Sequence, residues 1–438
     1  MDDREVRKTN LFIQIFADNW APFKERHSSY QAPLYDSVVS KMIGCGDPDF
    51  GFVEFGCTFC GEHKHRVAFT CKSQLCLRCG RVKSERFVYN VMAKLHPGVV
   101  YRHLILTIPD QLKNFFYKHR HSKELYSLFY ERGFQYIQDV FETVTKKRLH
   151  CGALVVLHTT GRKGNYRPHL HIIVMNGGID KISGEWVNIG YFPYDKILPR
   201  KWQWHLLNMI KEFDKSIETK NLVSKLWNKY PNGFYNSFMK GDVPRRSQHL
   251  VKYLSKYLFR PQISVKRIKD YDKKKKEVTY EYADHKSKKS EIEKVSVFDF
   301  IGRMVQQVLP KGFHKVKYYG LQRPKSYLKS KLLIKIGMEK INTIVVEVAH
   351  GIFKVAKDSY QERIKFWTGR DPLKCPGCSH QMELIKIWTK DKGVVFDLLD
   401  IYKRSKKPPD NLILLEQVKP TDPEDIVGEV YLQLNLAV

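Results

Sequence analysis

The stretch GALVVLHTTGRKGNYRPHLHIIVM, residues 152–175, contains two apolar runs on either side of a polar segment with two glycines. Short apolar runs bounded by turn residues are typical of β-strands. We therefore predict a β-hairpin with strands at 152–159 and 169–175 and a loop at GRKGNYRP. Because side chains alternate along a strand, His169 and His171 share one face and Leu170 lies on the other.

Two imidazoles on one face of a strand can bind the same metal ion. His158 stands near the end of the first predicted strand, and pairing of the two strands brings it close to His169. The hairpin therefore predicts a three-histidine metal site formed by His158, His169 and His171. For the HxH pattern alone, a pair of surface histidines without a metal is the alternative interpretation.

A second motif lies downstream, in QHLVKYLSKYLFRP, residues 248–261. Tyr253 and Tyr257 are four residues apart, so on a helix their side chains share one face. Three cations flank them: Lys252, Lys256 and Arg260. If a metal polarises a phosphodiester and these cations offset its charge, a tyrosine oxygen can attack phosphorus in a transesterification. The alternative is an amphipathic helix that buries its tyrosines.

The cysteines are concentrated in one block, where CTFC and CLRC form two CxxC pairs. Each pair places two thiolates at the spacing that tetrahedral Zn²⁺ requires, with bonds of about 2.3 Å. We predict a structural zinc bound by four ligands: Cys57, Cys60, Cys76 and Cys79. Cys71 is a substitute or a bystander, and His63 or His65 are further candidates. Buried thiols without a metal are the alternative.

A second, later pair is Cys375 and Cys378, in the sequence CPGC. Two cysteines and the nearby His380 do not complete a zinc site, so a metal there is left open. Cys45 and Cys151 stand alone. An odd number of cysteines, with close pairs and no export signal, argues against a disulfide framework and for a reducing compartment.

The charge of the chain indicates an anionic partner. Lys and Arg total 76 against 46 Asp and Glu, a formal net charge of +30 over 438 residues. Such an excess favours nucleic acid over a membrane surface, since no long basic amphipathic helix with a clean apolar face is evident. With 42% hydrophobic residues the chain can form packed cores, and no apolar run is long enough to span a bilayer. We expect a cytoplasmic protein.

The HUH pair (two histidines around a hydrophobic residue) followed by YxxxY resembles the two-tyrosine HUH endonucleases. Within them the chain is most similar to bacterial rolling-circle insertion-sequence transposases, with Helitron transposases and rolling-circle replication initiators as more distant relatives. The matching stretches lie within residues 50–380, in this order: CKSQLCLRCG, HLILTIP, LHTTG, RPHLHIIV, YLSKYLFRPQIS, VTYEYADHK, VLPKGFHKVKYYGL and CPGC.

The resemblance implies metal binding by His169 and His171, with Mg²⁺ or Mn²⁺ as the catalytic ion, and nucleophilic roles for Tyr253 and Tyr257. It also implies that the protein recognises single-stranded DNA at transposon ends and in target DNA, and acts at the nucleoid. Relatives often have a further histidine where this chain has Arg167, which we expect to contact phosphate together with the three lysine and arginine residues around the tyrosines.

We expect an α+β fold with a central antiparallel sheet flanked by helices. The expected segments are an N-terminal helical segment at 1–48, a zinc-binding module at 49–98, an HUH endonuclease domain at 99–338 and a basic C-terminal region at 339–438. The predicted function is transposition through tyrosine-mediated cleavage. The alternatives are a plasmid or phage replication initiator, or a non-catalytic zinc-dependent DNA-binding protein.

Overall fold

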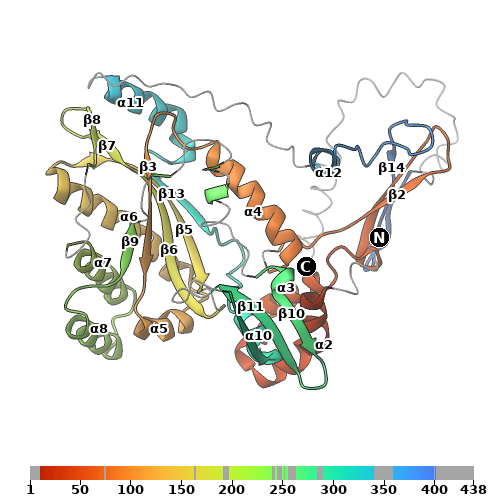
Figure 1. The fold of residues 1–438 in the computed structure, drawn as a ribbon, viewed down its shortest axis with the longest axis horizontal. Helices are drawn as coiled ribbons and strands as arrows, with labels where there is room; N and C mark the ends of the chain where they lie inside the picture. Colours follow the sequence, from red (N-terminus) through yellow and green to blue (C-terminus); the bar gives the residue numbers. More distant parts are fainter. Residues whose placement is uncertain are drawn as a thin grey trace. The chain divides into compact units, whose positions relative to one another are not determined.

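The chain forms two compact units in a computed structural model (Figure 1). The larger unit comprises Met1–Ile43 and Lys72–His350, and the smaller one Gly44–Cys71 and Gly351–Val438. The structure describes residues 10–73, 75–161, 164–190, 197–238, 242–243, 249–250, 252–254, 263–283, 290–339, 359–398 and 400.

The larger unit is built on a five-stranded antiparallel sheet with the strand order β13-β5-β6-β3-β9. Its strands are β3 (Tyr101–Thr107), β5 (Gly152–Thr160), β6 (Tyr166–Met175), β9 (Asn236–Phe238) and β13 (Val316–Gly320). Strands β5 and β6 are buried along most of their length on both faces, which explains their nearly continuous apolar sequences. The predicted hairpin is confirmed, with β6 beginning before the histidines.

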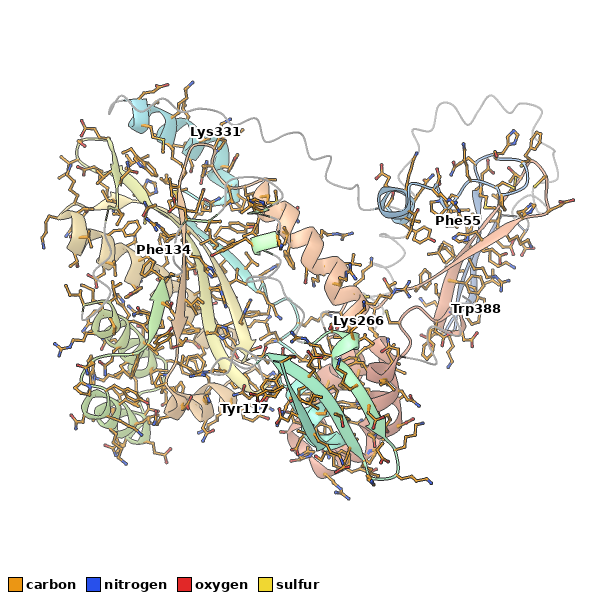
Figure 2. All side chains as sticks on the ribbon, in the orientation of Figure 1. Phe55, Tyr117, Phe134, Lys266, Lys331 and Trp388 are labelled. Atoms are coloured by element: carbon orange, nitrogen blue, oxygen red, sulfur yellow. The ribbon has the colours of Figure 1, made fainter. Side chains whose placement is uncertain are left out.

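Helices on one face of this sheet form the largest apolar core of the described residues (Figures 1 and 2). They are α5 (Lys113–Lys118), α6 (Lys123–Thr145), α7 (Ile197–Phe213) and α8 (Ile217–Lys229). Helix α6 approaches the sheet closely, because a Cβ atom at Gly133 would lie 2.7 Å from Leu170 Cδ1. Phe134 on the same helix stacks on Tyr319 of β13, with ring centroids 4.9 Å apart.

The opposite face, to which the odd-numbered residues of β6 point, is covered by α4 (Leu77–Met92) and α11 (Tyr327–Glu339). Leu250 and Leu254, in the tyrosine motif at 248–261, pack against the same core. The described residues of that segment, 249–250 and 252–254, are helical. Burial of both faces makes the sheet a rigid support for the side chains that project from it.

Three other groups of elements complete the larger unit. Helices α2 (Leu11–Arg26), α3 (Pro33–Ile43) and α10 (Val297–Val305) pack near a three-stranded sheet. That sheet contains β10 (Ile268–Asp272), β11 (Glu277–Ala283) and β12 (Ser290–Ser296). A small sheet combines β4 (Leu149–His150), β7 (Gly177–Asp180) and β8 (Trp186–Asn188).

The smaller unit joins two distant stretches of the chain in one antiparallel sheet, with the order β15-β14-β1-β2. Its elements are β1 (Gly51–Gly56), β2 (Lys64–Ala68), α12 (Tyr360–Thr368), β14 (Glu383–Thr389) and β15 (Gly393–Asp397). Strand β1 pairs with β14 from Gly51↔Thr389 to Gly56↔Glu383. The consecutive segments 49–98 and 339–438 expected from the sequence therefore need correction, because strand pairing combines parts of both.

Mixed helices and antiparallel sheets confirm the predicted α+β fold class. Of the helices in the described part of the chain, none combines the length and the apolar character that crossing a bilayer demands.

Trp202 on α7 provides a test of this core. It is fully buried, and its Nε1–H donates to the carbonyl oxygen of Thr107, at the end of β3, over 2.7 Å. Trp202→Phe leaves that oxygen without this partner, so we expect the free energy of unfolding to fall by about 1–3 kcal/mol. Urea denaturation followed by circular dichroism measures it. Trp204→Phe on the same helix is the control, because Trp204 is 52% exposed; equal losses in both variants would contradict the described packing.

Candidate active site and cysteine clusters

Three histidines converge on the face of the sheet that α4 covers. His158 of β5 and His169 of β6 are direct antiparallel partners, and His171 follows two residues later on the same face. The three residues offer nitrogen atoms that all lie within 4.8 Å of one another. The imidazole centroids of His158 and His171 are 4.3 Å apart. The hairpin register thus brings together the three histidines selected from the sequence.

Burial keeps the imidazoles of His169 and His171 neutral. The Nδ1 atom of His169 lies 2.8 Å from the carbonyl oxygen of Arg167, and since a carbonyl only accepts, Nδ1 has the hydrogen and Nε2 the lone pair. Burial lowers the pKa of His169 to about 4. Burial, and then the neighbouring imidazoles, hold the pKa of His171 well below its ordinary value. Neutral nitrogens that converge in this way are a donor set that fits a divalent metal ion.

A chain of hydrogen bonds connects the cluster to a tyrosine. His171 Nδ1 lies 2.8 Å from His103 Nε2, and His103 Nδ1 lies 2.7 Å from the hydroxyl oxygen of Tyr253. His103 is completely buried on β3, and burial lowers its pKa to about 4, so this imidazole is neutral and has a single N–H. Tyr253 is half-buried and packs at the margin of the same apolar core.

Sequence analysis missed His103. It lies in YRHLILTIP, which predicts a buried strand and says nothing about which strand lies beside it. The pairing Thr107↔His169 between β3 and β6 determines its direction, because alternation then turns His103 toward the histidine face. His103 is an even number of residues from Thr107, so the two share one face of β3. This spacing indicates the histidine face only once the pairing of Thr107 with His169 is known.

The other predicted site residues are partly described. Arg167 is exposed, and its Nη2 lies 3.6 Å from Asp110 Oδ1. Lys252 is exposed next to Tyr253. Tyr257, Lys256 and Arg260 lie outside the described residues, so the structure describes one member of the predicted tyrosine pair.

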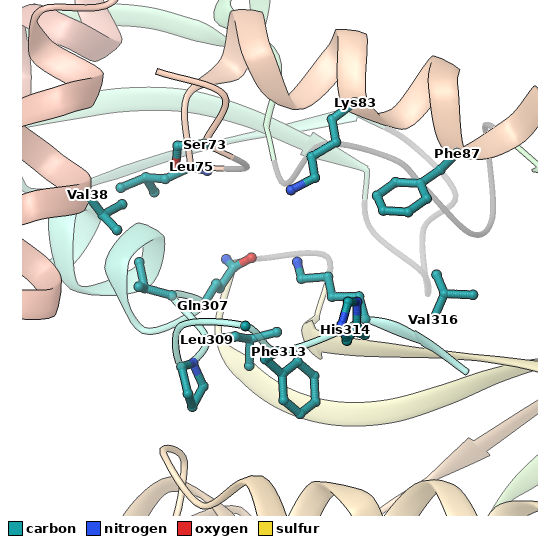
Figure 3. Close-up of a pocket in the computed structure, with 14 residues that line it drawn as sticks. Val38, Ser73, Leu75, Lys83, Phe87, Gln307, Leu309, Phe313, His314 and Val316 are labelled. Carbon is teal, nitrogen blue, oxygen red and sulfur yellow. Dashed lines mark hydrogen bonds between the residues drawn. The ribbon is translucent and has the colours of Figure 1, made fainter. Parts of the chain in front are cut away.

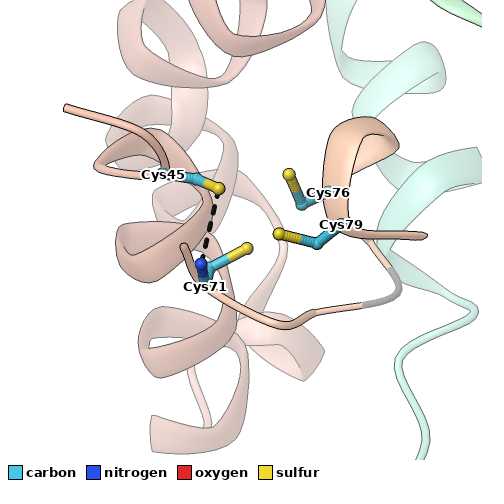
Figure 4. Close-up of side chains that lie close together, drawn as sticks. All are labelled: Cys45, Cys71, Cys76 and Cys79. Carbon is cyan, nitrogen blue, oxygen red and sulfur yellow. Dashed lines mark hydrogen bonds between the residues drawn. The ribbon is translucent and has the colours of Figure 1, made fainter. Parts of the chain in front are cut away.

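One cysteine cluster combines residues that the sequence analysis separated. The sulfur atoms of Cys45, Cys71, Cys76 and Cys79 all lie within 4.8 Å of one another (Figure 4). Cys76 and Cys79 lie at the beginning of α4, and the backbone N–H of Cys71 donates to Cys45 Sγ at 3.4 Å. The isolated Cys45 and the unassigned Cys71 are therefore neighbours of the CLRC pair.

The second cluster lies in the smaller unit and contains Cys57, Cys60, Cys375 and Cys378. The sulfur atoms of Cys57 and Cys378 are 3.4 Å apart, and those of Cys60 and Cys375 are 3.6 Å apart. A disulfide would require about 2.05 Å. The separations suit thiolates around one tetrahedral ion with bonds of about 2.3 Å. The backbone N–H of Cys60 is the main cause that lowers the pKa of Cys57 to about 6, which favours its thiolate.

These two clusters correct the predicted four-cysteine zinc site. Cys57 and Cys60 do not share a cluster with Cys76 and Cys79. The physical reason is the pairing of β1 with β14, which brings the CPGC pair beside CTFC. Of the two further candidates, His63 Nδ1 lies 3.6 Å from Cys60 Sγ, and His65 Nε2 lies 3.0 Å from the hydroxyl of Tyr360.

Comparison with known proteins gives two family matches and two informative relatives. A family described as putative transposase matches residues 152–328, and a transposase zinc-binding domain matches residues 15–108. The transposase for insertion sequence element IS801 of Pseudomonas savastanoi pv. phaseolicola is 26% identical over 294 residues, covering 65% of this chain and 69% of that protein. The putative transposase y4qJ of Sinorhizobium fredii (strain NBRC 101917 / NGR234) is 26% identical over 392 residues, covering 85% of this chain and 94% of that protein. No solved structure matches.

A helix-flanked antiparallel sheet, clustered cysteines and these matches define a transposase with a zinc-binding region. The chain is thus similar to insertion-sequence transposases of the rolling-circle IS91 type, as its motifs indicated. The zinc-binding match and the thiolate clusters together support structural zinc.

Proposed function

We propose that this transposase cuts and rejoins single-stranded DNA by attack of Tyr253 on phosphorus, beside a divalent ion bound by His158, His169 and His171. The observation that supports this most directly is the pair of hydrogen bonds that His103 makes, one with the Tyr253 hydroxyl and one with His171. Through His103, the hydroxyl of Tyr253 is connected to an imidazole of the cluster that would bind the ion. The substrates are the transposon ends and the target DNA.

The histidine cluster offers nitrogen donors alone. When bound there, a divalent ion would withdraw electron density from a phosphodiester and stabilise the charge that develops at phosphorus. Mg²⁺ is usually held through oxygen ligands, whereas imidazole is a typical ligand of transition ions. Of the two ions expected from the sequence, this donor set favours Mn²⁺.

The chemical step is a transesterification. The oxygen of Tyr253 forms a bond to phosphorus, and the bond from phosphorus to the 3′-oxygen of the preceding nucleotide breaks. That oxygen keeps the electron pair and leaves as a 3′-hydroxyl after it takes up a proton, while the phenol proton passes to solvent. The product is a 5′-phosphotyrosine. Because one ester replaces another, an incoming 3′-hydroxyl can reverse the reaction on a new strand.

His103 is proposed as a positioning residue for this tyrosine. His171 presents Nε2 to the cluster, so its Nδ1 bears the hydrogen and donates to His103 Nε2. Neutral His103 then has its one hydrogen on Nδ1 and donates it to the oxygen of Tyr253. A donor directed at the phenol oxygen favours the phenolate, which is the nucleophilic form. The tautomer of His171 thus determines which hydrogen-bond donor His103 presents to the nucleophile.

Tyr257 is proposed as the second nucleophile, four residues after Tyr253. With two tyrosines, one can hold the first 5′-phosphate while the other cuts again. Arg167, Lys252, Lys256 and Arg260 are proposed to contact phosphates of the strand.

Substitution of the tyrosines tests the mechanism. Tyr253→Phe keeps the ring and removes the nucleophile, so we expect the single variant to retain partial cleavage through Tyr257 and the Tyr253→Phe/Tyr257→Phe variant to form no covalent adduct. Denaturing gels of labelled single-stranded DNA with Mn²⁺ measure the adduct. Tyr318→Phe is a matched control, because Tyr318 packs against the same core and burial raises its pKa to about 12. An adduct that persists in the double variant would refute the assignment.

The metal ligands have a separate test. His169→Ala and His171→Ala are expected to abolish cleavage while single-stranded DNA binding is retained, because the ion acts on the phosphate rather than holding the strand.

Substitution of His103 tests its positioning role. His103→Phe fills a similar volume and removes both hydrogen bonds, so we expect the affinity of the histidine cluster for Mn²⁺ to fall by about 10–100-fold, as for other partners of metal-bound histidines. Electron paramagnetic resonance of free Mn²⁺ measures this affinity without any cleavage. Ile105→Val, at the next position on the same face of β3, is the control. Unchanged Mn²⁺ affinity in folded His103→Phe would contradict the role.

We propose that the two cysteine clusters bind two structural zinc ions, one at Cys45, Cys71, Cys76 and Cys79 and one at Cys57, Cys60, Cys375 and Cys378. Four thiolates leave no open coordination position, so these ions contribute to folding and not to cleavage. The second ion would link the two separate stretches of chain that form the smaller unit.

Metal analysis tests this count. We expect about two zinc ions per chain in the wild type and one in Cys375→Ser/Cys378→Ser. Cys151→Ser is the control, because Cys151 is buried outside both clusters and its pKa is raised to about 12 by burial. A wild-type protein with a single zinc, retained in Cys375→Ser/Cys378→Ser, would eliminate the second site.

A further inference from the structure

A cavity of about 260 Å³ opens within the larger unit, between α4 and the segment 307–316 that leads into β13 (Figure 3). Lys83 and Phe87 project into it from α4. On the opposite wall lie Phe313, His314 and Lys315. None of the motifs of the cleavage site uses this cavity.

The cavity is cationic, and its lining among the described residues contains no acidic side chain. Its two lysines, Lys83 and Lys315, approach from different elements, and no carboxylate is among the residues that line it. In the described ranges of the chain, no ion pair joins either lysine to Asp or Glu. Desolvation, and then the charge of Lys83, lower the pKa of Lys315 to about 8. Two like charges held together without a counter-ion cost free energy, and a bound anion would relieve that cost.

The walls of the cavity are attached to β5 on both sides of His158. The backbone N–H of Leu157 donates to the carbonyl oxygen of Lys315 at 3.0 Å. The hydroxyl of Thr160 donates to Oε1 of Gln307, another lining residue, at 3.2 Å. Two lining residues are therefore hydrogen-bonded to β5 at positions one and two residues from His158.

We propose that this cavity binds a backbone phosphate of single-stranded DNA, next to the phosphate that is cleaved at the histidine cluster. This inference rests on the proposed function for the position of the scissile phosphate. The two lysines supply the charge, and the rings of Phe87 and Phe313 supply apolar walls for the attached sugar or base. The cavity would thus set the direction in which the strand crosses the site.

The salt dependence of binding tests the proposal. Fluorescence anisotropy with a labelled single-stranded transposon end, in full-length protein without added divalent ions, gives the slope of log K against log salt concentration. For Lys83→Gln/Lys315→Gln we expect the slope to fall by about 0.7 for the one phosphate lost. The affinity is expected to fall roughly tenfold. Lys225→Gln/Lys229→Gln is the matched control, because it removes the same charge from exposed positions on α8.

A second arm separates a DNA phosphate from a small anion. Oligonucleotides with one neutral methylphosphonate are compared at successive positions, and we expect the wild type to lose affinity at one position near the cut while Lys83→Gln/Lys315→Gln is insensitive there. Inorganic phosphate at millimolar concentration is expected not to compete. Without DNA, the double variant is expected to melt at the same or a higher temperature, because two like charges are removed.

Equal salt slopes in the cavity variant and the α8 control, or equal methylphosphonate profiles in wild type and variant, would overturn the proposal. A second contradicting result would be that inorganic phosphate raises the melting temperature of the DNA-free wild type to that of the variant and also displaces DNA. The cavity would then be a small-anion site. These measurements involve no cleavage. A failure of the tyrosine mechanism would therefore leave the binding result readable on its own.

Discussion

The register of β5 against β6 determines the position of the three histidines at the proposed active site. His158 stands opposite His169, and the alternation of the antiparallel pair turns His171 to the same side. A shift by one residue would move His158 to the face covered by α6, away from the other two histidines. Apolar residues on both faces of these strands oppose such a shift, because it would bury an imidazole in the larger core.

The nucleophile and the histidine cluster are held by different parts of the core. The histidines project from the sheet, whereas Tyr253 lies in a helical segment anchored by Leu250 and Leu254. His103 joins the two through hydrogen bonds at both of its nitrogens. Because His103 itself is completely buried, water does not compete for its bond with His171, and that bond is stronger than it would be at the surface. The cationic cavity is a third feature, and its lining residues Lys315 and Gln307 are hydrogen-bonded to β5, the strand that contains His158.

Local patterns in the sequence were sufficient for the hairpin and for the three histidines, because alternation and a short loop fix which residues meet. They were insufficient wherever distant segments pair. His103 faces the cluster through the β3–β6 register, and Lys315 reaches the cavity through a loop before β13. The cysteines show the same limit: CTFC and CLRC are close in sequence, yet CTFC lies with a pair more than 300 residues away, because β14 pairs with β1.

The central claim is that Tyr253 forms a covalent bond with DNA beside the histidine cluster. The most direct measurement is mass spectrometry of the trapped adduct: wild-type protein is reacted with single-stranded DNA and Mn²⁺, then digested with nuclease and protease. The account predicts a nucleotide attached through phosphate to the peptide containing Tyr253, with Tyr257 as the second site of attachment. An adduct found on another residue, with both of these tyrosines unmodified, would contradict it.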